Sequence, residues 1–202
     1  MMNHTETQYP KKVTLGDGTE IILRLMVRED EDELLKFFRA VPEEDRVYLA
    51  DDVTNRAVIR SWCKELDYNK VLPVLALKDG AIIGDSTLRH TRMGWMRHVG
   101  HVRAVVALDW RRRGVATVLV GEIIEHAIMR GLAQLTFRAM DTQSSAINAM
   151  KVMGFQKEAV RKEHVVDLHG RPHDLVMMSN YVSELWKKME DMILDTEFEV
   201  IA

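Results

Sequence analysis

The residues with the clearest potential for chemistry lie in a short turn that contains three consecutive arginines. Residues 111–116 read Arg-Arg-Arg-Gly-Val-Ala and stand between an apolar run and a helix-forming segment. The first N–H groups of a helix have no partner within it, and the helix dipole adds positive potential there. Gly114 lacks a Cβ and Ala116 is small, so a ligand can come close to the backbone. The turn therefore predicts a cradle for a pyrophosphate group, reinforced by the three guanidinium groups.

A basic helix start that merely faces solvent is the alternative interpretation of this turn. Basic side chains oppose the dipole at that end of a helix, so three of them favour an anionic ligand. Nucleic acid is a poor candidate, because its binding depends on many phosphate contacts. The chain has 28 Lys and Arg against 31 Asp and Glu, a net charge of −3. We therefore expect no nucleic-acid partner.

Cysteine and histidine usage limits the other kinds of site. Cys63 is the single cysteine, so neither an intramolecular disulfide nor a cysteine-based zinc site can form. It lies in an apolar-periodic stretch, where a buried thiol is expected and a nucleophile is the alternative. The eight histidines form no recognised metal-binding motif, and we expect no metal ion.

The elements that must position the turn follow an α/β order. Strands are predicted at residues 12–15, 20–27, 71–77, 81–89, 99–108, 135–140, 155–167 and 174–182. Helices are predicted at residues 29–40, 54–66, 114–129, 142–153 and 184–194, with another that starts at Pro42. Residues 102–108 are apolar at nearly every position, which is typical of a central strand covered on both faces. The order predicts a mixed central sheet flanked by helices on both faces.

Length and composition predict one globular domain. The 202 residues are 47% hydrophobic and 29% charged, an ordinary composition for a chain that folds around its own core. We expect a flexible N-terminus over residues 1–11, a domain over 12–182 and a C-terminal helix and tail over 183–202. Neither a signal peptide nor a membrane span is expected, so a cytoplasmic location is predicted. The last helix could pack against a second subunit, giving a homodimer, or cap the domain.

The spacing Arg111-x-x-Gly114-x-Ala116 matches the R/Q-x-x-G-x-G/A signature of the GNAT acetyltransferase superfamily. Residues 106–110 resemble the strand and loop that precede that signature, and residues 150–155 resemble the family's helix that ends in Gly-Phe. Residues 15–38 and the sequence Pro-Glu-Glu-Asp-Arg at 42–46 resemble the protein-lysine acetyltransferase branch, which includes GNAT domains joined to acyl-CoA synthetases. The resemblance covers residues 12–182 and implies the GNAT fold.

The resemblance implies acetyl-CoA as the cosubstrate. The N–H groups of residues 112–117 would hold the pyrophosphate, and the strand end at residues 106–108 would pair with the pantetheine amides. Gln143 stands where the family has an Asn that contacts the cofactor. The family also implies a gap where this strand and residues 135–140 splay apart. The implied cofactor-binding residues are Val106, Ala107, Leu108, Arg111, Arg112, Arg113, Gly114, Val115, Ala116, Thr117 and Gln143.

The resemblance also points to the residue that takes a proton from the amine. The lysine-acetyltransferase branch has a Glu ten residues before the signature, and this chain has His101 there. Imidazole, with an ordinary pKa of about 6.5, can accept a proton at neutral pH. His101 is therefore the candidate base and His98 the reserve, while a structurally satisfied strand histidine is the alternative for His101.

Two further positions depart from the family pattern. Met150 stands where many members have a Tyr that acts as the general acid, and Met cannot donate a proton. Arg138 stands at another base position and stays protonated. Two functions consequently remain open. One is an acetyltransferase that acts on a protein lysine or a small amine, and the other is a non-catalytic acetyl-CoA sensor or regulatory domain.

Overall fold

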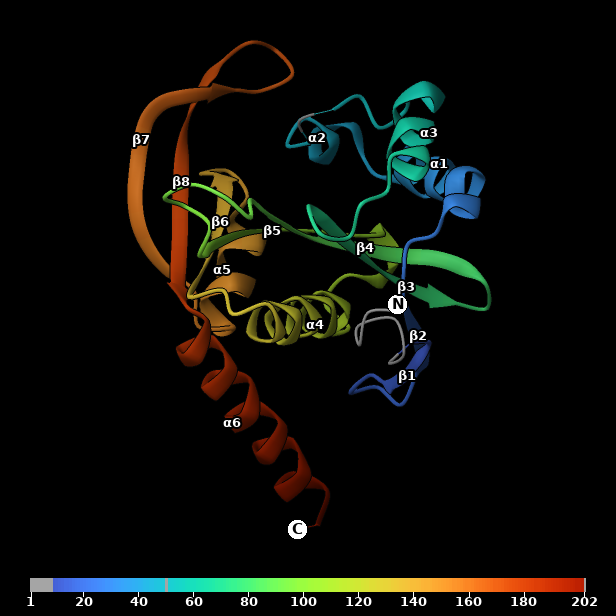
Figure 1. Ribbon diagram of the computed structural model, residues 1–202, viewed down its shortest axis with the longest axis vertical. Coiled ribbons are helices and arrows are strands. Elements are labelled where there is room, and N and C mark those ends of the chain that lie inside the picture. The colour runs from blue at the N-terminus through green and yellow to red at the C-terminus, as the bar shows by residue number, and fades with distance from the viewer. Residues whose placement is uncertain (1–8, 50, 202) are drawn as a thin grey trace.

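A computed structural model describes residues 9–49 and 51–201 of the chain. Eight strands form one sheet, shown in Figure 1 with the helices that cover it. The strands are β1 Lys11–Thr14, β2 Glu20–Leu25, β3 Val71–Lys78, β4 Ala81–His90, β5 Val99–Val106, β6 Gln134–Met140, β7 Gln156–Val166 and β8 Pro172–Tyr181. The α-helices are α1 Glu31–Ala40, α2 Glu43–Arg46, α3 Arg56–Lys64, α4 Val115–Met129, α5 Ser144–Val152 and α6 Val182–Ile201. Two short 3-10 helices, η2 Arg28–Asp30 and η3 Leu108–Trp110, precede α1 and α4.

The sheet has the order β1-β2-β3-β4-β5-β6-β8-β7. All neighbouring strands run antiparallel except β5 and β6, which run parallel because α4 connects them as a crossover. Strand pairs with a Gly-containing turn between them form hairpins, as the Asp79-Gly80 turn between β3 and β4 illustrates with φ values of 50° and 83°. The predicted α/β class with a mixed central sheet is confirmed.

Two strand predictions need correction in their details. Strand β5 ends at Val106 and not at residue 108, because its last pairing with β4 joins Val106 to Gly84. Leu108 instead opens η3 and is 57% exposed. The strand is central in the sheet, but its half from Arg103 to Val106 is only half buried, so it is not covered on both faces. The helix predicted from Pro42 comprises only Glu43–Arg46.

Each face of the sheet has its own hydrophobic core. Helices α1 and α3 lie on one face, and α4, α5 and the start of α6 lie on the other (Figure 1). Alternate residues of β3 belong to the two cores. Leu72, Val74 and Ala76 lie in the core with α4, and Leu75 and Leu77 lie in the core with α1. Cys63 belongs to the core under α1 and α3, where burial raises the pKa of its thiol to about 11. The expected buried cysteine is confirmed.

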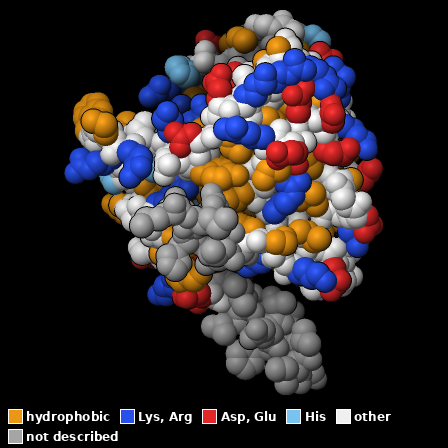
Figure 2. Space-filling model, turned by 45° about the vertical axis from the view of Figure 1, so that its right-hand side comes forward, with side chains coloured by type: hydrophobic (Ala, Val, Ile, Leu, Met, Phe, Trp, Pro, Cys, Tyr) orange, Lys and Arg blue, Asp and Glu red, His pale blue; other side chains and the backbone are white. Residues whose placement is uncertain are grey.

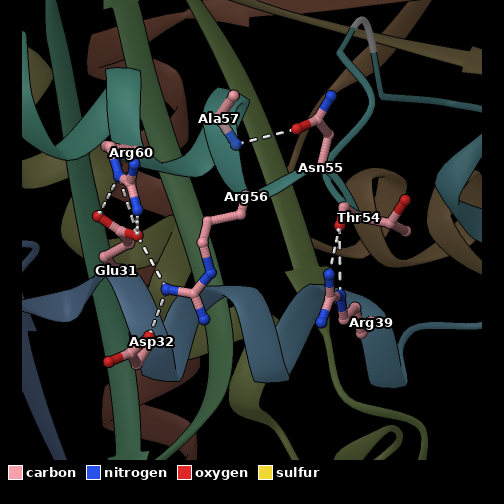
Figure 3. A network of polar contacts seen from close by, with 8 residues as sticks. All are labelled: Glu31, Asp32, Arg39, Thr54, Asn55, Arg56, Ala57 and Arg60. Atoms are coloured by element: carbon pink, nitrogen blue, oxygen red, sulfur yellow. Dashed lines mark hydrogen bonds and ion pairs between the residues drawn. The ribbon is translucent and has the colours of Figure 1, made fainter.

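Exposed charges tie α1 to α3. Glu31 accepts hydrogen bonds from Arg56 and Arg60, and Arg39 donates to the carbonyl of Thr54 (Figure 3). Figure 2 shows acidic and basic side chains interspersed on the upper part of the molecule, where these helices lie. Individual exposed ion pairs contribute little, but this network fixes the two helices relative to each other. They form one wall of the cavity described below.

The N-terminal end of the described chain packs against α4 through a polar cluster. Strand β1 begins at Lys11, one residue before the expected domain boundary. The Tyr9 hydroxyl donates to Glu122 at 2.9 Å and lies 2.8 Å from Nε2 of His126, and Lys11 forms an ion pair with Glu122. Because the phenol has one proton, Nε2 of His126 must donate to the Tyr9 oxygen, which leaves Nδ1 without a proton. Nδ1 has no partner among the described residues.

This cluster predicts a loss of stability at mildly acidic pH. Burial, followed by the charge of Arg130, lowers the pKa of His126 to about 4, because a second ring proton would find no acceptor. The unfolded chain binds that proton near pH 6.5, so the stability due to neutral His126 is complete above this pH and falls as the pH drops toward 4. We expect about 2 kcal/mol less free energy of unfolding at pH 5 than at pH 7 from this residue.

Urea unfolding of wild type and His126→Gln at the two pH values measures this effect. The variant should lose most of the difference, because glutamine does not titrate, whereas His164→Gln at an exposed position should keep it. An unchanged pH dependence in His126→Gln would rule out the assignment. The cluster's other titratable groups, Tyr9, Lys11, Glu122 and Glu125, keep their side chains in both variants.

Candidate functional site

The central feature of the site is an opening between β5 and β6. The two parallel strands pair only from Val99 to His101 on β5 and from Gln134 to Thr136 on β6. Beyond these positions each strand continues, β5 to Val106 and β6 to Met140, without pairing to the other. Backbone N–H and C=O groups of both strands therefore border a V-shaped gap with His101 at its apex. Such groups need partners, which an extended ligand with amide groups can provide.

The arginine turn closes the wide end of this gap. Gly114 is the N-cap of α4 with φ 87°, a left-handed conformation that favours glycine, and a Cβ added there would meet nothing within 4 Å. The first hydrogen bond of the helix runs from Val118 N–H to the Gly114 carbonyl. The N–H groups of the three preceding residues thus have no partner within the helix. No acidic side chain occupies the first turn of α4 to offset its dipole, so the helix start favours an anion.

Two of the three arginines bind carboxylates of the N-terminal part of the chain. Arg111 forms an ion pair with Asp45 at 2.6 Å and also donates to the carbonyl of Val106. Arg113 forms an ion pair with Asp17 at 2.7 Å and lies with its guanidinium carbon 4.2 Å from the ring centre of Trp110. Arg112 is exposed with φ 59°. The guanidinium groups of Arg111 and Arg113 therefore reach a ligand only if they share or exchange these partners.

The strand end expected to pair with pantetheine is partly engaged within the protein. The N–H of Ala107 donates to the carbonyl of Ile83, and the carbonyl of Leu108 accepts from the N–H of Arg111. Gln143 lies at the start of α5, where its side-chain oxygen accepts a hydrogen bond from the N–H of Met140. Gln143 thus lies just after the end of β6, the strand on the other side of the gap from β5.

His101 is held in one orientation by the neighbouring strand. Its Nδ1 lies 2.5 Å from Oγ1 of Thr136, and that hydroxyl donates to the carbonyl of Gly100 at 3.4 Å. With the carbonyl of Gly100 available as acceptor for the hydroxyl proton, the Thr136 oxygen can accept from Nδ1–H. This arrangement leaves the lone pair on Nε2, so His101 has a proton-accepting nitrogen.

The charges around His101 favour its neutral form. Partial burial, then the charges of Arg138 and Arg89, lower its pKa below the ordinary value of 6.5. At neutral pH the imidazole is consequently free to accept a proton. His98, the reserve candidate, is exposed in the loop before β5, where its carbonyl accepts from Ala133 and Gln134. The geometry therefore places His101, and not His98, at the apex of the gap.

The remaining predicted positions supply no second acid or base. Met150 is buried, with 3% of its surface exposed, in the core under α5. Arg138 is exposed on β6. Within the described residues, no group of three or more His, Cys, Asp or Glu side chains is arranged to hold a metal ion. In the same part of the chain, no helix combines the length and apolarity that crossing a membrane requires.

A cavity of about 320 Å³ lies between α1, α3 and the sheet. His101 is not part of its lining, but its cross-strand neighbour Arg89 is. The cavity lining includes Asp85, Thr87 and Arg89 of β4 and Arg103 of β5. These four residues were not predicted as site residues from the sequence. Their signal was the alternation of polar with apolar positions along each strand, which places polar side chains on one face. Only the pairing of β4 with β5 brings Arg89 opposite His101.

Comparisons with known proteins match this geometry to one family. The family model described as the acetyltransferase (GNAT) family matches residues 31–155. The GNAT domain of S. lividans PAT aligns with a TM-score of 0.71 and 17% identity, covering 85% of this chain and 96% of that one. A ribosomal-protein-alanine N-acetyltransferase from Brucella melitensis aligns with a TM-score of 0.67 and 21% identity over 79% and 98% of the two chains. A GNAT-family acetyltransferase from Streptococcus pneumoniae has a TM-score of 0.68 and 19% identity over 80% and 99%.

Proposed function

The chain belongs to the acetyltransferase (GNAT) family, and we propose that it transfers the acetyl group of acetyl-CoA directly to an amine. One observation carries this proposal. The V-shaped gap between β5 and β6 joins His101 at its apex to the open helix start at Gly114. A ligand with a pyrophosphate at one end and amides along its length fits such a path. About five strand residues, or ~17 Å at 3.3 Å per residue, separate the apex from the end of β5.

The chain provides the binding groups that acetyl-CoA needs. The N–H groups of residues 112–117 would hold the pyrophosphate, helped by the dipole of α4. The strand end at residues 106–108 and the side-chain amide of Gln143 would bind from the two sides of the gap. When bound, acetyl-CoA supplies an activated acetyl thioester. Arg111 and Arg113 would contribute positive potential while they keep their contacts to Asp45 and Asp17.

His101 would remove the proton that the attacking amine must lose. A lysine-like amine has an ordinary pKa of about 10.4 and is almost wholly protonated at pH 7. Two arginines, Arg89 and Arg138, lie on the same face of the sheet as His101, and their field disfavours a charged ammonium there. Nε2 of His101 then accepts the remaining proton as the new bond forms.

The buried Met150 means that the leaving sulfur receives no proton from the usual family position. A thiol with an ordinary pKa near 8.5 can leave as the thiolate, so transfer can proceed without an acid. The same residue favours the second candidate function, a non-catalytic acetyl-CoA sensor. That function predicts tight binding of acetyl-CoA with no release of thiol for any amine.

Isosteric substitutions at Gly114 test the proposed cofactor site. Gly114→Asp and Gly114→Asn impose the same left-handed backbone on a side chain of equal size, but only aspartate adds a negative charge. We expect calorimetric titration to show acetyl-CoA binding to wild type, and binding weaker by about 10- to 100-fold in Gly114→Asp than in Gly114→Asn. Gly131→Asp is the matched control, because Gly131 ends the same helix with φ 65° and open space around it.

The proposal fails if wild type does not bind acetyl-CoA, or if the aspartate and asparagine variants bind it equally well. Acceptor-dependent release of free thiol separates the two candidate functions. Thiol release with an amine supports transfer, whereas binding without release for every amine supports the sensor.

A further inference from the structure

The cavity lined by Arg89, the cross-strand neighbour of His101, has the size of a small-molecule site. Its volume of about 320 Å³ lies at the lower end of the range for ligand pockets. Helices α1 and α3 form its roof, and strands β3, β4 and β5 form its floor. The apolar part of its lining comprises Met26, Leu34, Phe38, Trp62, Leu66, Val71 and Pro73. A small molecule with an apolar group can occupy such a space.

The lining has six charged side chains, of which four form two ion pairs, while Glu65 and Arg89 form none among the described residues. Arg103 donates to the buried Asp85 at 2.7 Å, and its guanidinium carbon lies 5.4 Å from the ring centre of Trp62 and 6.0 Å from that of Phe38. Lys70 pairs with Asp67 at 3.4 Å. These contacts neutralise two positive charges with two negative ones.

Arg89 brings a further positive charge to the mouth of the cavity. It lines the cavity, is exposed, and stands directly opposite His101 in the pairing of β4 with β5. Arg138 lies on β6, two residues beyond Thr136 and on the same face. These two guanidinium groups give His101 a positive surrounding. A ligand whose amine lies at His101 therefore needs an anionic group close to that amine.

Resting on the proposed function, we propose that the acceptor is a free α-amino acid with an apolar or aromatic side chain, whose carboxylate binds Arg89 and whose amine lies beside His101. In an α-amino acid a single carbon atom separates the carboxylate from the amine. Cross-strand neighbours have Cβ atoms about 4.5–5.5 Å apart, so adjacent Arg89 and His101 side chains can bind adjacent groups. The side chain then enters the apolar part of the cavity.

The transfer step balances without a further reactant. The lone pair of the amine nitrogen forms the new bond to the acetyl carbon, and the carbon–sulfur bond breaks with its electron pair on sulfur. Nε2 of His101 accepts the amine proton. A carboxylate held by Arg89 keeps the amine oriented toward the gap, because a bidentate guanidinium contact fixes both position and direction.

A series of acceptors that share one side chain tests the proposal. L-phenylalanine, L-phenylalaninamide and 2-phenylethylamine differ only in the carboxylate, and a peptide with an internal lysine and a blocked N-terminus represents protein acceptors. Thiol release should give L-phenylalanine a kcat/KM at least 10-fold above that of the amide, the amine and the peptide. Calorimetry should also show L-phenylalanine binding to the protein saturated with CoA.

Arg89→Gln identifies the group that recognises the carboxylate. The variant should lower kcat/KM for L-phenylalanine about 10-fold or more, mainly through KM, and should lower kcat/KM for 2-phenylethylamine much less, because that acceptor loses only the effect of the Arg89 charge on His101. Arg97→Gln, which removes the same charge from an exposed loop outside the cavity lining, should behave as wild type with both acceptors.

Failure of this inference is distinguishable from failure of the proposed function. If acetyl-CoA binds and amines are acetylated with no preference for the carboxylate, or with the lysine peptide preferred, the amino-acid acceptor is wrong and the acetyltransferase stands. Equal losses for all acceptors in Arg89→Gln, or no turnover of any acceptor, also overturn the inference. If acetyl-CoA does not bind to wild type, both proposals fall.

Discussion

Replacing His101 with glutamine is expected to lower kcat by about 10²- to 10⁴-fold, the usual contribution of a positioned general base. Glutamine keeps a planar polar group of similar length but does not accept a proton at neutral pH. Binding of acetyl-CoA should be unchanged, because His101 lies at the apex of the gap and the pyrophosphate site lies at Gly114. Steady-state thiol release and calorimetry measure the two effects separately.

The pH dependence of kcat provides the signature of this base. Partial burial and the charges of Arg138 and Arg89 place the pKa of His101 below 6.5. Activity should therefore be complete at neutral pH and fall as the pH drops through a midpoint below 6.5. The acidic limb should be absent from the residual activity of His101→Gln. A full acidic limb in that variant would assign the proton transfer to another group.

Thr136 offers an independent check, as a positioning residue that acts through His101. Thr136→Val removes the acceptor of Nδ1–H and should shift the acidic limb while it lowers kcat, whereas Thr136→Ser should restore both. A purely structural role of Thr136 would change stability and leave the midpoint of the limb in place.

Replacing Asp85 with alanine is expected to destabilise the fold by about 3 kcal/mol, since it leaves the guanidinium of Arg103 without its buried partner. Asp85 is 2% exposed, and Nε of Arg103 already lacks a partner among the described residues. Burial raises the pKa of Asp85 although Arg103 opposes this shift. Desolvation therefore offsets much of the attraction in the pair.

The free energy of unfolding should recover in a double variant that lacks both charges. Asp85→Leu combined with Arg103→Met replaces the ion pair by apolar groups and should regain most of the lost free energy of unfolding, as buried ion pairs often allow. Urea unfolding of the single and double variants gives the coupling as a double-mutant cycle. If the double variant loses as much free energy of unfolding as the two single variants together, Asp85 and Arg103 do not stabilise each other, and the interpretation of the pair is wrong.

Local patterns in the sequence were sufficient to predict most of the fold. Period-2 and period-3.6 patterns locate the strands and helices because each depends on neighbours in the chain. The glycine at position 114 and the arginines before it identify the helix start, because the requirement for a left-handed residue is local. The C-terminal end of β5 was misplaced, since it depends on where β4 stops pairing.

The acceptor side of the site could not be predicted in the same way. Arg89 and His101 become neighbours only through strand register, and Phe38 and Trp62 reach the cavity from two separate helices. Likewise, nothing in the spacing of Arg111 and Arg113 indicated that Asp45 and Asp17 would pair with them. Such contacts depend on the tertiary fold, and a single sequence carries no local signal for them.

The two carboxylates that pair with the arginine turn affect its charge in the ligand-free protein. Three adjacent cations at the positive end of a helix repel one another and that helix end. Asp17 and Asp45 act as built-in counter-ions, and hydrogen bonds from Thr19, with the contact to Arg113, hold the pKa of Asp17 below its ordinary value. Two of the three positive charges of the turn are thus neutralised in advance by the protein itself. When a polyanion binds, Arg111 and Arg113 would exchange a carboxylate of the protein for the ligand. Few salt ions would therefore be released into solution.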